Sequence, residues 1–233
     1  MKVTAVILSA GKGTRMGSDV PKQYLNINGK PMLHYTLRTF ENSNVDELVI
    51  VTGKDDIEYV RSEIVCKYDI KKVKDIVEGG KERYNSSYNG IIAATGADYI
   101  LLHDAARPCI TTRKINELIN EVKKCGACIL GVPVKDTIKL VDEQNKVTES
   151  LRRDMLWSIQ TPQAFLRDDM IKAYKIMFEN SMDNITDDSM VMEKFGNKKV
   201  KVLLGEYNNI KATTPEDMRV LEKIKKSVDI GDR

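Results

Sequence analysis

The sequence has few cysteines and histidines, and it lacks any long hydrophobic segment. Four cysteines and two histidines in 233 residues are too few for a disulfide-stabilised fold or for a zinc site with repeated Cys and His ligands. No apolar stretch approaches the ~20 residues of a membrane span, and the chain starts with a strand-like segment instead of a signal peptide. We therefore expect a cytoplasmic protein with no membrane partner.

The sequence also lacks a strong excess of charge of either sign. It has 37 basic and 34 acidic residues, a net charge of +3, and no polybasic run, which disfavours a nucleic-acid groove or a membrane-surface patch. We expect no nucleic-acid partner. The length and the 42% hydrophobic content suit a single domain over residues 1–233 with a sizeable core.

One C-x-x-C motif is present, formed by Cys125 and Cys128. A metal or redox site would need more than this motif supplies, because there is no second pair and neither His34 nor His103 stands at ligand spacing. We interpret these cysteines as structural thiols.

Apolar strand-like segments alternate with segments of helical period, which predicts a sheet covered by helices on both faces. The expected strands are residues 3–8, 47–52, 73–77, 99–103, 129–134 and 200–204. The expected helices are residues 32–40, 57–68, 84–94, 114–124, 168–180, 187–195 and a last helix that begins at Thr214. The predicted fold class is α/β, a single three-layer domain with a mostly parallel, twisted, Rossmann-like sheet.

Residues 135–152 interrupt this alternation with the pattern of a β-hairpin. From the pattern alone, two interpretations are equally good. The hairpin extends the edge of the sheet, or it is an arm that reaches a neighbouring subunit or a site.

The first expected strand runs into a glycine-rich loop, Ser9-Ala10-Gly11-Lys12-Gly13-Thr14-Arg15-Met16-Gly17. Glycines let backbone N–H groups turn toward a bound oxyanion, and Lys12, Arg15 and Lys22 add positive charge. The loop is not a P-loop, and it lacks the third glycine of a dinucleotide fingerprint because Met16 stands there. The pattern predicts a phosphate-binding loop of another kind.

Further polar groups follow the strands that the sequence predicts, at residues 79–86 and 103–108. In open parallel sheets, ligands bind at the carboxyl ends of the strands. Asp104 followed by Arg107 is commonly a local ion pair or a helix cap. With a phosphate loop at the same edge, a role for Asp104 in holding Mg²⁺ is favoured.

These motifs resemble, in order and over nearly the whole chain, those of the 2-C-methyl-D-erythritol 4-phosphate cytidylyltransferases of isoprenoid precursor synthesis. The blocks that carry the resemblance are Ala10–Met16 with Pro21-Lys22-Gln23-Tyr24, Gly79-Gly80-Lys81-Glu82-Arg83, His103-Asp104-Ala105-Ala106-Arg107-Pro108, Val134-Lys135-Asp136-Thr137-Ile138-Lys139, Arg153-Asp154-Met155-Leu156-Trp157, Thr161-Pro162-Gln163-Ala164-Phe165, Thr186-Asp187-Asp188 and Asn209-Ile210-Lys211. The resemblance implies a CTP-dependent nucleotidyltransferase that uses Mg²⁺, binds CTP and a sugar-alcohol phosphate, and forms a homodimer through residues 135–152.

The resemblance also implies roles for individual residues. The expected catalytic residues are Arg15 and Lys22, as cations that stabilise the transition state, and Arg153 and Lys211, which position the acceptor. The expected nucleotide-binding residues are Ser9, Ala10, Gly11, Gly13, Gly80, Lys81 and Ser86. The expected acceptor-binding residues are Asp104, Ala105, Arg107, Thr137, Thr161 and Thr186, and Asp104 is also the expected metal ligand.

Two alternatives stay open at this stage. Ribitol-5-phosphate cytidylyltransferases are similar to this chain in nearly every block, so the acceptor could be ribitol 5-phosphate and the product CDP-ribitol. A catalytically silent nucleotide-binding module is disfavoured because Arg15, Lys22, Asp104 and Lys211 are all present. Asn208 departs from the family's common acidic residue, and metal binding would then depend more on Asp104.

Overall fold

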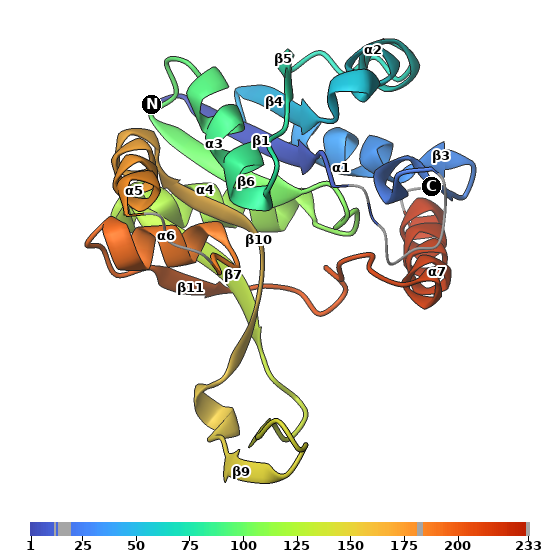
Figure 1. Ribbon diagram of the computed structural model, residues 1–233. Helices are drawn as coiled ribbons and strands as arrows, with labels where there is room; N and C mark the ends of the chain where they lie inside the picture. The colour runs from blue at the N-terminus through green and yellow to red at the C-terminus, as the bar shows by residue number, and fades with distance from the viewer. Residues whose placement is uncertain (12, 14–19, 181–183, 232–233) are drawn as a thin grey trace.

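The computed structural model describes residues 1–11, 13, 20–180 and 184–231. Its central feature is a seven-stranded sheet of order β11-β7-β10-β6-β1-β4-β5 (Figure 1). The strands are β1 (Val3–Ser9), β2 (Asn26–Ile27), β3 (Lys30–Pro31), β4 (Glu47–Thr52), β5 (Val73–Glu78), β6 (Tyr99–Asp104), β7 (Ala127–Pro133), β8 (Lys139–Val141), β9 (Val147–Ser150), β10 (Trp157–Leu166) and β11 (Lys201–Leu204). The predicted α/β fold class and its mostly parallel sheet are confirmed, since only β10 runs against its neighbours in this sheet.

Helices cover both faces of the sheet. They are α1 (Met32–Glu41), α2 (Ile57–Tyr59), α3 (Arg83–Ala93), α4 (Thr112–Cys125), α5 (Arg167–Glu179), α6 (Asp188–Phe195) and α7 (Pro215–Gly231), with short 3₁₀ segments η2 (Lys22–Tyr24), η3 (Lys54–Asp56) and η5 (Arg153–Met155) and a π-helical segment η4 (Val60–Cys66). In the part of the chain that the structure describes, no helix combines the length and the apolar character needed to cross a bilayer.

The core has two main layers because side chains alternate along each strand. Ile7, Leu48 and Ile50 point to one face, where they pack against α1, η4 and α4. Their neighbours Val6 and Val49 point to the other face, where they pack against α3, α5 and α6. The central strands are therefore buried on both sides, as their continuous apolar sequences predict.

β10 is the main element of the sheet that the sequence pattern did not predict. Its sequence, Trp157 to Leu166, includes Gln160, Thr161, Pro162 and Gln163, and polar residues and proline are uncommon in a central strand. The pairing with β7 shifts register between Gln160 and Gln163, and the Thr161–Pro162 peptide bond is cis. The irregularity accommodates the proline, and buried hydrogen bonds satisfy the polar side chains.

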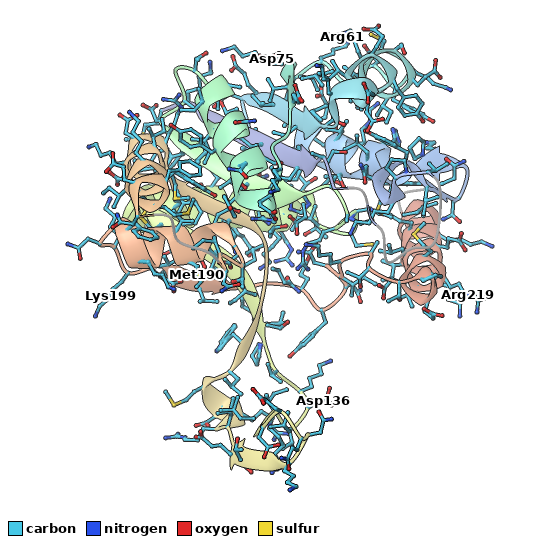
Figure 2. All side chains as sticks on the ribbon, viewed as in Figure 1. Arg61, Asp75, Asp136, Met190, Lys199 and Arg219 are labelled. Carbon is cyan, nitrogen blue, oxygen red and sulfur yellow. The ribbon has the colours of Figure 1, made fainter. Side chains whose placement is uncertain are left out.

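β7 and β10 continue beyond the sheet as the two sides of a projecting arm (Figure 1). Pro133 still pairs with Trp157, and the N–H of Val134 donates to Leu156 O at 3.0 Å. At the far end, β8 and β9 form a separate two-stranded sheet. Asp136, which lies on the arm, is well separated from the body of the protein (Figure 2). Residues 135–152 therefore project from the body and do not extend the edge of the sheet, and whether the arm reaches a neighbouring subunit or a site stays a prediction.

The C-x-x-C motif has the character of a structural pair. Cys125 and Cys128 are both free thiols, and burial raises the pKa of Cys128 to about 12. Among the described residues, no group of three or more His, Cys, Asp or Glu side chains is placed to hold a metal ion. A thiol with so high a pKa is a poor nucleophile and metal ligand.

His34 on α1 gives the fold a measurable pH dependence. Burial, reinforced by the positive charges of Lys30, Arg38 and Lys225, lowers the pKa of His34 to about 4. Between pH 6.5 and about 4 the unfolded chain binds a proton that the folded chain does not, so the free energy of unfolding falls as the pH falls. We predict a loss of up to about 1.4 kcal/mol per pH unit from this residue in that window, and none above it.

Urea unfolding of the wild type and of His34→Gln at several pH values checks this prediction. The comparison removes the contribution of the carboxylates to the pH dependence, because they titrate in both proteins. The variant should lose stability less steeply between pH 6.5 and 4 than the wild type. If the free energies of unfolding of the two proteins fell equally with pH, the fold would not be holding the imidazole neutral.

Candidate active site

The register of the sheet brings the carboxyl ends of four strands into one row. Leu8 is paired with Asp104, Ser9 with Thr52, and Thr52 with Glu78. The segments that follow β1, β5 and β6 therefore leave the sheet side by side at one edge. This is the position at which open α/β sheets bind ligands.

A cavity of about 480 Å³ opens at this edge. It is lined by ten of the residues predicted from the sequence, which are Ser9, Ala10, Gly11, Lys22, Gly80, Lys81, Ser86, Asp104, Ala105 and Lys211. Leu8, Gln23, Glu82, Arg83 and Ala106 complete its lining among the described residues. Four of the lining side chains are basic and two are acidic, so the cavity suits an anionic ligand.

One wall is built by the close approach of two turns. A Cβ added to Gly79 would lie 2.4 Å from the Cβ of Ala10, and one added to Gly80 would lie 2.2 Å from the Cβ of Asn85. The Gly80 N–H donates to Ser86 Oγ at 3.0 Å, and Glu82 caps α3. Glycine is required at both positions because a side chain at Gly79 would push away the loop after β1, and one at Gly80 would collide with the first turn of α3.

Lys22 adds a cation to the lining of the same cavity. Its Nζ donates to the carbonyl oxygen of Ala212 at 3.0 Å, which joins η2 to the segment that carries Lys211. Gly13 has a φ of 63°, and a Cβ added there would lie 3.0 Å from Lys22 Cγ. The loop backbone and the lysine stem are thus in close contact. Arg15, the other predicted transition-state cation, lies outside the described residues.

Asp104 is the electrostatic centre of the cavity. Its Oδ2 lies 2.7 Å from Lys211 Nζ and 3.9 Å from Arg107 Nε, and its Oδ1 lies 3.2 Å from Arg83 Nη2. Burial alone would favour the neutral acid, but Arg83 and Lys211 hold the pKa of Asp104 far below its ordinary value. The group is therefore a carboxylate at neutral pH.

Arg83 and Asp188 are site residues to which the sequence analysis assigned no role. Arg83 Nη1 donates to the fully buried Asp188 Oδ2 at 2.8 Å, while its Nε donates to Asp104 Oδ1 at 3.2 Å. Tyr174 OH donates to the other oxygen of Asp188 at 2.7 Å. Burial disfavours the guanidinium, but the two carboxylates raise the pKa of Arg83. The sequence offered one signal, since both residues lie in the blocks that carry the resemblance.

Two predicted acceptor residues lie behind the cavity. Thr161 Oγ1 accepts a hydrogen bond from the N–H of Asp104 at 3.1 Å, and it lies 3.0 Å from His103 Nδ1. Arg107 Nη1 donates to Asn209 O at 2.8 Å. Both residues support Asp104 and the segment before Lys211. Within this chain their contacts are with protein groups beside the cavity.

Three other predicted residues do not line this cavity. Thr137 and Arg153 lie on the arm between β7 and β10, where Arg153 Nη1 donates to Lys135 O at 3.1 Å. Thr186 is exposed just before α6, with its Oγ1 3.6 Å from the sulfur of Met190. Their assignment as acceptor-positioning residues stays a prediction.

The donor chemistry of the cavity fits a magnesium ion that also binds substrate phosphates. Mg²⁺ is commonly held by one or two carboxylates and by phosphate oxygens. Asp104 supplies an ionised carboxylate at the cavity wall, and Lys211, its partner at 2.7 Å, is a partly exposed and flexible side chain. Asn208 is exposed and does not line the cavity, so it adds no ligand there.

Neither histidine is placed for proton transfer at this cavity. His103 is fully buried between Thr161 and Arg107, and burial lowers its pKa to about 3. His34 lines a different cavity. The arrangement is therefore rich in cations and has no imidazole base, which suits a reaction between anions better than one that begins with proton removal.

Comparisons with known proteins agree with this geometry. The profile of the 2-C-methyl-D-erythritol 4-phosphate cytidylyltransferase family matches residues 3–227. Proteins of that name from Lachnospira eligens and Lachnoclostridium phytofermentans are 46% and 44% identical to this chain over 219 and 223 residues. The alignments cover 93% and 96% of this chain, and 96% of each relative.

A solved structure shows the same fold. The crystal structure of 4-diphosphocytidyl-2C-methyl-D-erythritol synthase from Anaerococcus prevotii superposes with a TM-score of 0.85 at 33% identity, over 97% of this chain and 96% of that one. Because the family profile spans nearly the whole chain and the identities exceed 40%, the chain belongs to the 2-C-methyl-D-erythritol 4-phosphate cytidylyltransferase family.

Proposed function

We propose that this protein transfers the cytidylyl group of CTP to 2-C-methyl-D-erythritol 4-phosphate, forming 4-diphosphocytidyl-2-C-methyl-D-erythritol and pyrophosphate. Family membership carries this proposal. The basic cavity at the carboxyl edge of the sheet supports it, because ten residues expected at the substrates line that cavity. The relatives and the solved structure carry names with methylerythritol and not ribitol.

The reaction joins two anions and needs no general base. An oxygen of the acceptor's phosphate forms a bond to the α-phosphorus of CTP, and the bond from that phosphorus to the bridging oxygen breaks as pyrophosphate leaves. A phosphate monoester has a second pKa near 6 and is mostly a dianion at neutral pH. Catalysis therefore consists of positioning and charge stabilisation, for which Lys22, Lys211 and the predicted Arg15 supply cations.

Asp104 is the residue that we propose for binding Mg²⁺, together with the phosphates of the nucleotide. The ion would supply positive charge that offsets the charge of the phosphate groups. Lys211 holds the carboxylate in the absence of substrates. Lys211 would then be available to contact the acceptor phosphate, which is the role that the resemblance implies for it.

Pyrophosphate release from CTP and Mg²⁺ tests the function. Parallel reactions contain 2-C-methyl-D-erythritol 4-phosphate, ribitol 5-phosphate or no acceptor. We expect release with the methylerythritol phosphate and at most background release in the other two. Release driven by ribitol 5-phosphate would move the protein to CDP-ribitol synthesis with the same chemistry, and no release in all three would favour a nucleotide-binding module.

Lys22→Ala tests the transition-state role of this lysine. Loss of one preorganised donor costs on the order of 10²- to 10³-fold in rate in other enzymes, and we expect a loss of kcat of that size here. Lys175→Ala, which removes an exposed lysine on α5, is the matched control and should retain wild-type turnover. A kcat for Lys22→Ala within about threefold of wild type would remove Lys22 from the catalytic residues.

The arm supports a further proposal, that two chains form a homodimer through it. Its exposed apolar side chains include Leu140, Val141 and Val147, which are 46%, 52% and 60% exposed. A projecting hairpin with exposed apolar groups is typical of an interaction surface. In a dimer, Thr137 and Arg153 could approach the cavity of the other subunit, which would reconcile their position on the arm with their predicted roles.

Analytical ultracentrifugation of Val147→Asp tests the dimer. A charge in an apolar interface should weaken association by at least about tenfold, or about 1.4 kcal/mol. Val220→Asp is the matched control, since Val220 is also an exposed valine, 47% accessible, but lies on α7. A wild-type protein that sediments as a monomer at tens of micromolar, or equal effects of the two variants, would contradict an interface on the arm.

A further inference from the structure

A second cavity, of about 470 Å³, is separate from the candidate active site. Its walls come from α1, the start of α4, the turn after η4 and α7. In Figure 1, α7 and the β2–β3 ribbon lie together at the end of the molecule next to α1. No residue that lines this cavity is shared with the first one, so it needs its own explanation.

The walls of this second cavity are basic. Lys30, Arg38 and Lys225 line it, and none of its described lining residues is acidic. Arg38 is held in place by a hydrogen bond to the carbonyl oxygen of Tyr68. The ammonium of Lys225 lies 5.2 Å from the centre of the Tyr35 ring. Three positive charges around one small cavity favour an anionic occupant.

His34 adds an unsatisfied polar atom to the same wall. The residue is 5% exposed, and its Nδ1 is buried without a hydrogen-bond partner. Its ring lies against Tyr68, with 4.1 Å between ring centres. Buried polar atoms are nearly always paired with protein, water or a ligand. A neutral imidazole can carry its proton on Nδ1, and an oxygen of a bound anion would be an acceptor for it.

The amino terminus of α4 faces the cavity as well. Thr111 is the N-cap residue of this 14-residue helix, and both Thr111 and Thr112 line the cavity. The first turn of a helix has unpaired backbone N–H groups and a partial positive charge, and it commonly binds phosphate or sulfate. The start of α4 therefore favours an anionic occupant, as the three basic side chains and the imidazole do.

We propose that this second cavity binds a small molecule with a phosphate or diphosphate group. The basic side chains and the start of α4 would hold the phosphate, and the rings of Tyr35, Tyr68 and His34 would contact the rest of the molecule. This site does not depend on the proposed function of the first cavity.

An apolar cluster lies between the two cavities. Cys109, Tyr35 and Ile224 line the second cavity and also belong to or pack on this cluster. The same cluster contains Ala106, which lines the first cavity, and Ala212, whose carbonyl oxygen accepts from Lys22. A bound molecule would therefore contact side chains that pack against the supports of Lys211.

The two histidines of the chain make the proposal measurable, because His34 lines the second cavity and His103 lies next to Asp104 at the first. NMR spectra of the imidazole C–H groups are recorded for the full-length protein as pyrophosphate is added. We expect the His34 signals to shift and to saturate. A shift of the His103 signals alone would mean that pyrophosphate binds only beside Asp104, and that outcome would overturn the proposal.

A charge-reversal pair supplies the control. Lys30→Glu places a negative charge at the cavity, and because Lys30 is exposed on β3 the fold should be retained, which a thermal unfolding curve checks. Lys123→Glu changes the net charge equally at the other end of α4. The pyrophosphate concentration that half-saturates the His34 shift should rise about fivefold or more in Lys30→Glu. In Lys123→Glu it should rise less than about twofold. Equal changes in both variants would overturn the proposal.

Discussion

The structure depends on keeping two buried carboxylates, Asp104 and Asp188, charged at the edge of the sheet. A carboxylate in a protein interior is costly unless cations and hydrogen-bond donors surround it. Arg83 contacts both carboxylates, and Lys211 contacts Asp104. This requirement ties the starts of α3 and α6, the end of β6 and the segment before α7 together. These ion pairs hold the four segments together around the first cavity.

The sequence predicted the parts of this arrangement that local patterns can specify. Continuous apolar segments such as residues 47–52 predicted central strands, and glycines at positions 79 and 80 marked a turn that the structure shows to be sterically required. The strand order placed the phosphate loop and Asp104 at one edge of the sheet, and the family resemblance added Lys211 to them. Local chemistry and strand order were sufficient because a parallel sheet aligns its carboxyl ends.

The parts that the sequence did not predict depend on partners far apart in the chain. The ion pair between Arg83 and Asp188 joins residues 105 positions apart, and neither residue is unusual in its own segment. β10 has polar residues and a proline that are uncommon in a central strand, and hydrogen bonds with distant residues such as Asp187, Asn209 and Ser189 make its burial possible. The second cavity is likewise formed by residues from four separate segments.

β10 connects the arm to the segments that hold Asp104 and Lys211. This strand begins at the arm with Trp157 and runs beside β6, where Thr161 accepts a hydrogen bond from the Asp104 backbone. Asn209 contacts the same stretch through the carbonyl of Thr161, only two residues before Lys211. A single strand thus connects the arm to the backbone on both sides of the Asp104–Lys211 ion pair, so a change in the position of the arm would have a direct covalent path to the cavity.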